Sequence, residues 1–170
     1  MVVKLIVAVA KGNNAIGKNN QLLWHLPADM KYFKETTKGF PVVTGRKNYE
    51  SIPEKFRPLP GRENVVITRD VNYKAPGAHV CTSIQEALEL VKKFQNDSCY
   101  IIGGGQIYKQ CLSENLVDEL YITWVDATIP ADTFFEGFSS DDWEKEELMN
   151  QDKDEKNEYA FTVVKYTKSK

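Results

Sequence analysis

The sequence predicts an α/β fold, namely a single-domain sandwich with a mostly parallel central sheet, helices on both faces and a C-terminal antiparallel hairpin. Short apolar runs rich in valine and isoleucine recur along the chain, which is typical of strands buried in parallel sheets. Segments of helical periodicity alternate with these runs, as they do in α/β proteins. Because 170 residues can bury one full core, we expect a single domain over residues 1–170.

The first predicted strand leads through a polar loop into a helix. Residues 2–10 form an apolar run typical of a buried strand. Residues 11–21 contain two glycines and four asparagines, and loops of this length without regular structure are often functional lids. Pro27 suits the first position of a helix, and Asp29 complements the helix dipole two residues later. Asp29 also lies beside the apolar face of this helix, four residues before Phe33. The presence of a carboxylate at this place has to be explained.

The rest of the chain repeats the order of strand, connection and helix. Ser83 and Glu86 form a capping box that marks the start of one helix. The predicted elements are a strand at 40–45, a short helix at 46–52, an irregular proline-rich connection at 53–64, a strand at 65–69, a helix from Ser83 to about Phe94, a strand, glycine turn and helix at 99–112, a strand at 118–127, and two strands within 143–167 around a charged turn.

Composition and charge exclude several classes of function. A net charge of −2 and a pI near 5.8 argue against nucleic-acid binding. The apolar run at 5–10 is too short for a signal peptide or a membrane span, so we expect a cytoplasmic protein without a membrane partner. Cys81, Cys99 and Cys111 show no C-x-x-C spacing and are expected to be buried, reduced thiols. No metal site is expected, because the chain has only two histidines to combine with them.

Three consecutive glycines join an apolar strand to a helix. Gly103, Gly104 and Gly105 would let a phosphate approach the backbone amides and the positive end of that helix. The Rossmann fingerprint would require a glycine at the position of Tyr108, and no P-loop lysine follows. Taken alone, the motif is therefore equally well interpreted as a tight turn.

Basic and hydroxyl side chains follow two further predicted strands. Gly45, Arg46 and Lys47 end the second strand, and Thr68 and Arg69 end the third. Two basic side chains at a helix N-terminus oppose the dipole, which indicates an anion nearby. Because ligands bind at the carboxyl ends of strands in open α/β sheets, the three strand ends together predict a ligand with several phosphates. A solvated basic rim is the alternative for any one of them.

Some candidate residues also have an ordinary structural interpretation. Arg62 lies in a segment stiffened by prolines and could present its guanidinium to a carboxylate, or it could simply lie on the surface. Thr123 could reflect only the preference of threonine for strands. The aromatic residues that could be plain core residues are Trp24, Phe33, Tyr108 and Tyr121.

The ordered set of motifs is far more specific than any one of them. The motifs are IGKNNQLLWHLPADMKYFK, PVVTGRKNYESI, RPLPGRENVVITR, YIIGGGQIYKQCL, DELYITWVDA, DTFF and DDWE. In this order and spacing the chain resembles the dihydrofolate reductase family from Val3 to about Tyr166. The resemblance implies an NADPH-dependent oxidoreductase of one-carbon metabolism. Its reaction would reduce 7,8-dihydrofolate to 5,6,7,8-tetrahydrofolate, by hydride transfer to C6 and protonation at N5.

The resemblance also implies roles for residues around the substrate. Asp29 would be the active-site acid that hydrogen-bonds the pterin edge, with a pKa raised by burial; Thr123 would support that contact, and Trp24 would order a water. Arg62 would pair with the α-carboxylate of the glutamate, with Arg57 nearby. The other residues implied at the substrate or in catalysis are Val7, Phe33, Ile52, Leu59, Ile102 and Tyr108.

For the cofactor, the resemblance implies NADPH held at the strand ends. Arg46, Lys47, Thr68 and Arg69 would hold its phosphates, and a cis peptide is implied at Gly103–Gly104. The remaining implied cofactor contacts are Val9, Ile16, Gly17, Leu22, Gly45, Asn48, Thr82, Gly104, Gly105, Gln106, Ile107 and Tyr108.

Four positions depart from common patterns of the family. Leu23 stands where a proline often precedes the tryptophan, and Asn48 replaces a residue that usually carries a hydroxyl. Gln106 and Thr82 occupy places where some relatives have basic residues. The 2′-phosphate contact is therefore expected to depend mainly on Arg46, Lys47 and Arg69.

Two rival interpretations remain at the level of sequence. One is a reductase of another pterin or of a riboflavin-pathway pyrimidine on the same fold, which Arg62 and the pair of Asp29 and Thr123 disfavour. The other is a catalytically silent nucleotide-binding module, which has no use for Asp29. The expected ligands are dihydrofolate, NADPH and antifolate inhibitors, and the expected state is a monomer.

Overall fold

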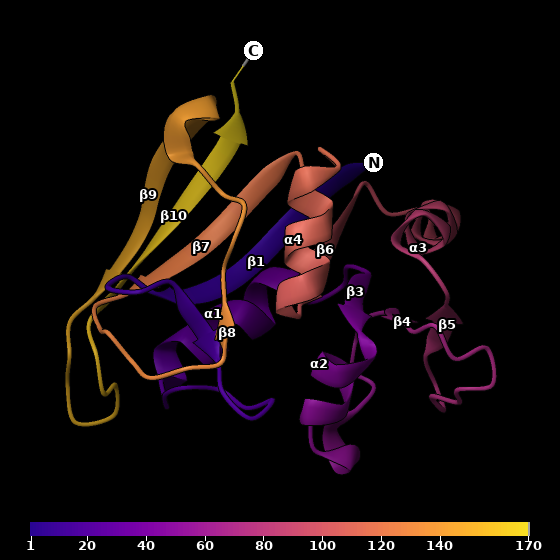
Figure 1. The fold of residues 1–170 in the computed structure, drawn as a ribbon, viewed down its shortest axis with the longest axis horizontal. Coiled ribbons are helices and arrows are strands. Elements are labelled where there is room, and N and C mark those ends of the chain that lie inside the picture. Colours follow the sequence, from indigo (N-terminus) through magenta and orange to yellow (C-terminus); the bar gives the residue numbers. More distant parts are fainter. Residues whose placement is uncertain (170) are drawn as a thin grey trace.

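The computed structural model describes residues 1–169 and contains one large sheet. The strands of this sheet are, in chain order, β1 (Val2–Ala10), β3 (Val42–Gly45), β4 (Asn64–Ile67), β5 (His79–Cys81), β6 (Ser98–Gly103), β7 (Glu119–Val125), β9 (Trp143–Gln151) and β10 (Phe161–Lys168). They lie side by side in the order β5-β4-β3-β6-β1-β7-β10-β9 (Figure 1). The pairings from β5 to β7 are parallel, and those of β10 with β7 and β9 are antiparallel. The predicted mostly parallel sheet with a C-terminal hairpin is confirmed.

Helices cover both faces of this sheet, as predicted. They are α1 (Pro27–Thr37), α2 (Arg46–Ser51), α3 (Ile84–Val91) and α4 (Gly105–Ser113). Alternate residues of β1 divide between the two faces, because successive side chains of a strand point to opposite sides. Leu5 and Val7 pack in one hydrophobic cluster with residues of α3 and α4, whereas Ile6 packs in another with Tyr32 and Phe33 of α1. Figure 1 accordingly shows α4 in front of the sheet and α1 behind it.

The sequence prediction was wrong about part of the polar loop. Residues 11–21 were expected to lack regular structure, but they contain the short strand β2 (Ala15–Gly17), which pairs with β8 (Thr133–Phe134) in a second sheet. Backbone bonds from Phe135 N to Asn14 O at 2.8 Å and from Asp132 N to Gly17 O at 3.1 Å flank this pairing. Strands this short show no readable periodicity, and the short edge strand β5 escaped prediction for the same reason.

Two other elements differ from prediction in detail. The helix after Ser83 is confirmed, but its last turn, Lys92–Phe94, is a 3-10 helix that ends at Gln95 with a φ of 59°. The proline-rich connection contains the 3-10 turn Glu54–Phe56 and a cis peptide bond at Arg57–Pro58. The cis bond implied at Gly103–Gly104 is also present.

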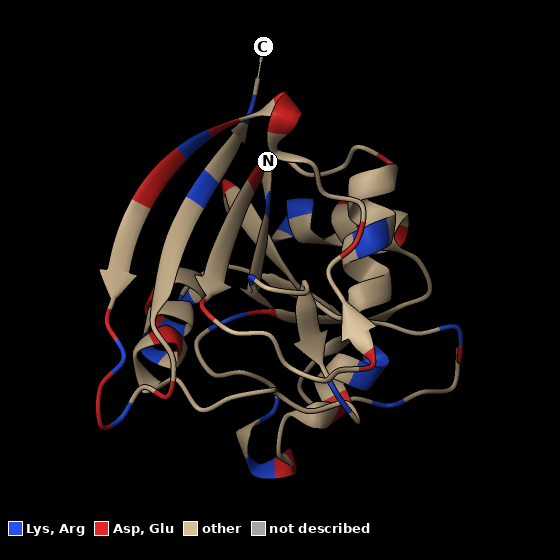
Figure 2. Cartoon of the chain, turned by 60° about the vertical axis from the view of Figure 1, so that its left-hand side comes forward, with Lys and Arg blue, Asp and Glu red and all other residues tan. Residues whose placement is uncertain are grey.

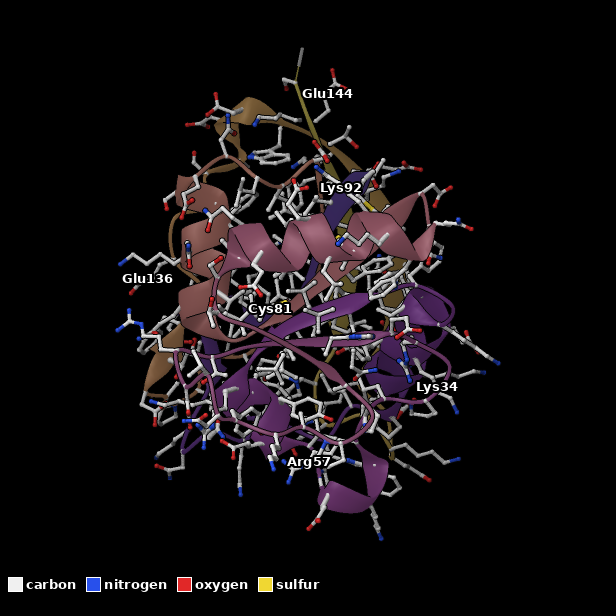
Figure 3. All side chains as sticks on the ribbon, turned by 90° about the vertical axis from the view of Figure 1, so that its right-hand side faces the viewer. Lys34, Arg57, Cys81, Lys92, Glu136 and Glu144 are labelled. Carbon is white, nitrogen blue, oxygen red and sulfur yellow. The ribbon has the colours of Figure 1, made fainter. Side chains whose placement is uncertain are left out.

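The thiols lie where the sequence predicted them. Cys81, Cys99 and Cys111 are buried and unpaired, and Figure 3 shows Cys81 in the interior beneath α3. Burial raises the pKa of Cys99 and that of Cys111 to about 12, so both stay protonated. Among residues 1–169, no helix is long and apolar enough to cross a membrane. In the same residues, no group of three or more histidine, cysteine, aspartate or glutamate side chains is arranged to hold a metal.

Candidate active site

The first turn of α1 brings a carboxylate against strand β7. Thr123 Oγ1 donates a hydrogen bond to Asp29 Oδ1 at 2.8 Å, across a separation of 94 residues in the sequence. Thr123 is buried, and its strand pairs with β1 so that Thr123 faces Ala8 in the register. Removal from water raises the pKa of Asp29, and the Thr123 hydroxyl opposes this shift by a smaller amount. The predicted contact between Asp29 and Thr123 and the predicted direction of the pKa are both confirmed.

The helix dipole alone does not explain this arrangement. An acid that served only to complement the N-terminus of α1 would gain from lying in water with a low pKa. Asp29 instead lies where desolvation favours its neutral form. A raised pKa combined with a single neutral hydroxyl partner is typical of a carboxyl group that exchanges a proton or binds a polar ligand.

Apolar side chains from α1, β6 and the proline-rich connection form a cluster on the same face of the sheet. Phe33 and Leu59 are partly buried and pack against Ile102 and other buried members of this cluster. The structure does not place two of the expected residues there. Ile52 packs with Tyr49 in a different cluster, and Val7 packs on the opposite face of the sheet.

Arg62 is held in place by two hydrogen bonds. Its Nε donates to Pro60 O at 2.9 Å, and its Nη1 donates to Thr37 Oγ1 at 2.9 Å. Thr37 is fully buried at the end of α1, and its hydroxyl donates to Phe33 O. These bonds fix the orientation of the guanidinium, a group whose planar fork can pair with a carboxylate. No local pattern in the sequence indicates Thr37, because the partners lie 25 residues apart.

Arg57 has different surroundings. Its Nη1 lies 3.5 Å from Tyr49 O, and its guanidinium carbon lies 5.6 Å from the centre of the Tyr49 ring. Arg57 is placed by α2, therefore, and not by the end of α1. In Figure 3 it lies in the lower part of the molecule.

The three strand ends singled out in the sequence are neighbours in the sheet. Strands β4, β3 and β6 are adjacent and parallel, so their carboxyl ends form one edge. The β6 end leads into α4, whose first turn carries no acidic residue. A Cβ at Gly104 would meet only Asn48 Cβ, at 3.9 Å, so the backbone is open to a ligand there. Gly45, in contrast, allows close packing, because its Cβ would lie 3.1 Å from Ile107 Cγ1.

The side chain of Asn48 forms hydrogen bonds to two strands at this edge. Its Nδ2 donates to Thr44 Oγ1 at 2.9 Å and to Ile102 O at 3.2 Å. Thr44 Oγ1 in turn donates to Gly103 O at 3.1 Å. The amide of Asn48 therefore links α2 to the glycine run, although a hydroxyl residue is usual at its position. Thr44, which the sequence interpretation did not single out, completes the link.

The environment of Arg46 corrects one argument from the sequence. Arg46 Nε lies 3.2 Å from Glu50, its Nη1 lies 3.5 Å from Asp70, and its guanidinium stacks 4.1 Å from the centre of the Tyr73 ring. Two carboxylates thus offset its charge, so its position at the start of α2 does not by itself require an anion. Lys47 remains exposed and has no such compensation among the ion pairs of residues 1–169.

The remaining strand-end residues also differ from one another. Arg69 is exposed beside Thr68 at the end of β4, whereas both the backbone N–H and the hydroxyl of Thr82 donate to the carboxylate of Glu86. That carboxylate makes Thr82 a poor contact for phosphate. Arg69, Lys47, Arg46 and the open N-terminus of α4 together fit a phosphorylated dinucleotide.

The polar loop lies between β8 and α2. Asn19 N donates to Asp132 Oδ2 at 2.8 Å, and this bond contributes most to lowering the pKa of Asp132. Asn20 Nδ2 donates to Lys47 O at 2.7 Å, which ties the loop to the helix that carries the basic residues. Leu22 is largely exposed at 71%. Ile16 and Gly17 therefore lie in the anchored strand β2, and Ile16 is next to the glycine run, where a Cβ at Gly105 would lie 2.7 Å from Thr133 Cγ2 and 3.6 Å from Ile16 Cδ1. Leu22 lies in the exposed loop that follows.

Two implied residues lie inside the core, and a third is half-buried against it. Tyr108 is buried, and its hydroxyl donates to Ile6 O at 2.7 Å. Burial raises the pKa of Tyr108 far above its usual range, so this group is a fixed donor. Val9 packs on the same face as Tyr108, and Trp24 packs with Leu26 at the start of α1.

Comparisons with known proteins agree with this geometry. Residues 2–168 match the family described as dihydrofolate reductase. The chain is 44% identical to dihydrofolate reductase type 3 of Salmonella typhimurium, over 96% of each chain. It is 41% identical to dihydrofolate reductase of Haemophilus influenzae, over 94% of each chain. The structure of dihydrofolate reductase from Enterococcus faecalis, complexed with NADP(H) and RAB-propyl, matches with a TM-score of 0.89 and 34% identity, covering 99% of this chain and 97% of that one.

The fold and the site together define an α/β oxidoreductase that uses a nicotinamide dinucleotide. The chain belongs to the dihydrofolate reductase family. Its activity is the NADPH-dependent reduction of 7,8-dihydrofolate to 5,6,7,8-tetrahydrofolate, so the predicted enzyme class and cofactor are confirmed.

Proposed function

We propose that Asp29, oriented by Thr123, is the group through which this chain binds and protonates dihydrofolate. The observation that carries the proposal is the half-buried Asp29 carboxyl, with its raised pKa and its 2.8 Å bond from Thr123. A carboxylate in this position can accept two parallel hydrogen bonds from the flat edge of a pterin. Its raised pKa keeps a proton within reach near neutral pH.

The protein contributes position, electrostatics and a proton to the reaction. When bound, NADPH supplies the hydride, which is the chemistry of the cofactor and not of the side chains. Thr123 fixes the Asp29 carboxyl, and Trp24, packed beside Leu26, orders a water near the substrate. The Tyr108 hydroxyl donates to Ile6 O and so joins α4, which follows the glycine run, to β1.

The rest of the substrate occupies the apolar face and the proline-rich connection. Phe33, Leu59 and Ile102 contact the rings, because they already form one cluster. Arg62 pairs with the α-carboxylate, since its bonds to Thr37 and Pro60 orient its free edge. The contacts proposed on weaker support are Arg57, Ile52 and the backbone of Val7, which lie outside that cluster.

The cofactor lies along the carboxyl edge of β4, β3 and β6. Lys47, Arg69 and Arg46 bind its phosphates, and Arg46 exchanges its carboxylate partners for phosphate on binding. The amides from Gly103 to Gly105 face the pyrophosphate. The other proposed contacts are Val9, Ile16, Gly17, Leu22, Gly45, Asn48, Thr68, Thr82, Gln106, Ile107 and Tyr108, of which Thr82 has the least support because of Glu86.

We also propose that the chain acts as a single domain and a monomer in the cytoplasm. Strands from both ends of the sequence, β1 and β10, flank β7 in the same sheet, which supports one folding unit. Three buried, unpaired thiols support a reducing compartment. Antifolates are expected ligands, because the Enterococcus faecalis relative is described in complex with RAB-propyl beside NADP(H).

The rival functions have less support than folate reduction. A silent nucleotide-binding module would not bury a carboxyl against a single hydroxyl, and a reductase of small pterins would not need Arg62 held at the edge of the site.

A steady-state assay tests the proposal. Loss of NADPH absorbance should require dihydrofolate, and a small pterin without the glutamate should react far less efficiently. Equal reaction with both substrates would favour the reductase of another pterin, and no reaction with either would favour the silent module.

A further inference from the structure

The helix that carries Asp29 lacks an N-cap of its own. The residue at the N-cap position is Leu26, whose side chain has no polar atom, and Pro27 has no N–H to donate. The N–H groups of Asp29 and Met30 both donate to Leu26 O at 3.0 Å. Ala28 is therefore the one residue of this first turn whose N–H must find a partner elsewhere.

That partner comes from the loop between β9 and β10. Asn157 Oδ1 accepts the hydrogen bond from Ala28 N at 3.1 Å, across 129 residues of sequence. Asn157 is 5% exposed, although it lies in a loop whose neighbours are mostly charged and exposed. Figure 2 shows this loop with its charged residues at the end of the hairpin. A buried asparagine within a charged surface loop indicates that its side chain has a specific role.

The orientation of the Asn157 amide is fixed by Asp154. Asn157 Nδ2 donates to both carboxylate oxygens of Asp154, at 3.1 and 3.3 Å, and Asn157 N donates to Asp154 Oδ1 at 2.7 Å. Asp154 N closes the turn by donating to Asn157 O at 3.1 Å. Because a carboxylate can only accept, the NH₂ group must face Asp154 and the amide oxygen must face Ala28.

The hairpin of β9 and β10 also supports the contact between Asp29 and Thr123. Thr123, which donates to Asp29, is paired with Val163 of β10 in the antiparallel ladder. Phe161 and Val163 form a hydrophobic cluster with Leu26, and Ala28 packs against it. The hairpin therefore reaches Asp29 by two routes: through Thr123 to its carboxyl group, and through Asn157 to the backbone one residue earlier.

We propose that Asn157 is a positioning residue for Asp29. It holds the first turn of α1 so that the carboxyl group meets both Thr123 and the pterin edge. This inference rests on the proposed function of Asp29. A side chain that acts only through Asp29 has a signature that a general structural role lacks, because its effect on the rate disappears when the Asp29 carboxyl is absent.

The test is a double-mutant cycle of Asn157→Ala and Asp29→Asn, read as the rate of hydride transfer at neutral pH with both substrates saturating. We expect Asn157→Ala to slow the step about tenfold in the parent protein, within the hundredfold range that a displaced reacting group can cause. In the Asp29→Asn background we expect less than about a twofold effect. The control Glu155→Ala changes an exposed residue of the same loop and should leave the rate unchanged.

A polarity swap makes the test independent of folding defects. The double variant that combines Asp154→Asn with Asn157→Asp keeps the net charge and exchanges the two side chains. A carboxylate at position 157 can then accept from Ala28 N, while an amide at position 154 donates to that carboxylate. We expect the double variant to react within about threefold of the parent rate. The single variant Asn157→Asp, which sets two carboxylates together, should be slower.

Three results would overturn the inference. They are an equal effect of Asn157→Ala in both backgrounds, a parent-like rate for Asn157→Ala, and a swapped variant that folds but has lost more than about tenfold in rate. Failure of the proposed function is a separate outcome, because it would appear as a parent-like rate for Asp29→Asn alone.

Discussion

In its proposed role, Asp29 serves the reaction at a cost to the stability of the fold. Its carboxyl group is largely desolvated and has one hydroxyl partner, Thr123, which offsets only part of the desolvation. The pKa of Asp29 in the folded protein is therefore above its usual value of 3.8. An acid whose pKa rises on folding destabilises the protein wherever it is ionised, because the folded state then holds the less favourable charge.

The upward shift in the pKa of Asp29 leads to a prediction for the stability of the protein. Asp29→Asn should raise the free energy of unfolding at neutral pH, since the amide can still accept from Thr123 and carries no charge. The gain should be complete above the raised pKa and should disappear as the pH falls below 3.8, where the parent becomes protonated in both states. Thermal melts of both proteins from pH 3 to pH 8 measure it. A gain that is undiminished at pH 3 would show that burial of the charge is not its cause.

Arg62 provides a second prediction for a single residue. Arg62→Leu should weaken binding of folates by roughly 1.5–3 kcal/mol, the usual contribution of a hydrogen-bonded charged group. Small pterins without the glutamate should bind as before, because Thr37 and Pro60 hold Arg62 at the edge of the site. Dissociation constants for both ligand types, measured on both proteins, decide the matter. A parallel loss for the two ligands would assign Arg62 a structural role only.

The structural elements were predictable from the sequence to different degrees. The long strand β1, the capped helix α3 and the hairpin of β9 and β10 were readable because periodicity and capping are local properties. Strands β2, β5 and β8 were not, because each contains too few residues to show a period. The same limit applies to the site: Asp29 was visible in its own helix, but Thr37, Thr44 and Asn157 act through partners that are distant in sequence.

A residue at one of the strand ends leads to a prediction on the preference for NADPH over NADH. Arg69→Ala should raise KM for NADPH and leave KM for NADH nearly unchanged, because Arg69 is exposed at the end of β4 without a carboxylate partner among the ion pairs of residues 1–169. Steady-state kinetics with both cofactors measures the difference. Lys34→Ala, at a charged surface position of α1 away from this edge, is the matched control. Equal losses with both cofactors would remove Arg69 from the 2′-phosphate contact.

The loop at 11–26 leads to a prediction on its mobility, measured as amide hydrogen exchange. Its first part is tied to β8 through β2, whereas residues 18–26 have few anchors, namely the bond from Asn19 to Asp132 and the bond from Asn20 to the Lys47 carbonyl, both of them exposed. Amide exchange of residues 18–26 should therefore be fast in the free protein and slow when NADPH and a folate analogue bind together. Hydrogen exchange by mass spectrometry on the free, binary and ternary states measures this. Unchanged protection in the ternary state would exclude the loop as a lid.

At the scale of the whole molecule, the sheet assembles a site from segments that are far apart in the chain. The order β4-β3-β6 sets the carboxyl ends of three strands side by side, and the order β1-β7-β10 sets Thr123 between β1 and the C-terminal hairpin. Helix α1, packed on this sheet, then carries Asp29 to Thr123. One sheet thus positions both the acid on α1 and the edge proposed to bind the phosphates, which is the arrangement that hydride transfer between two bound molecules requires.

The pH–rate profile of Asp29→Asn tests this account most directly. Asparagine keeps the size of the side chain and an acceptor for Thr123, but it removes the proton. We predict that turnover at neutral pH falls by roughly 10²–10⁴-fold, the usual contribution of a positioned acid. Part of the rate should return at lower pH, where dihydrofolate is protonated from solvent. Near-normal turnover at neutral pH, with the profile of the parent, would contradict the assignment of Asp29 as the active-site acid.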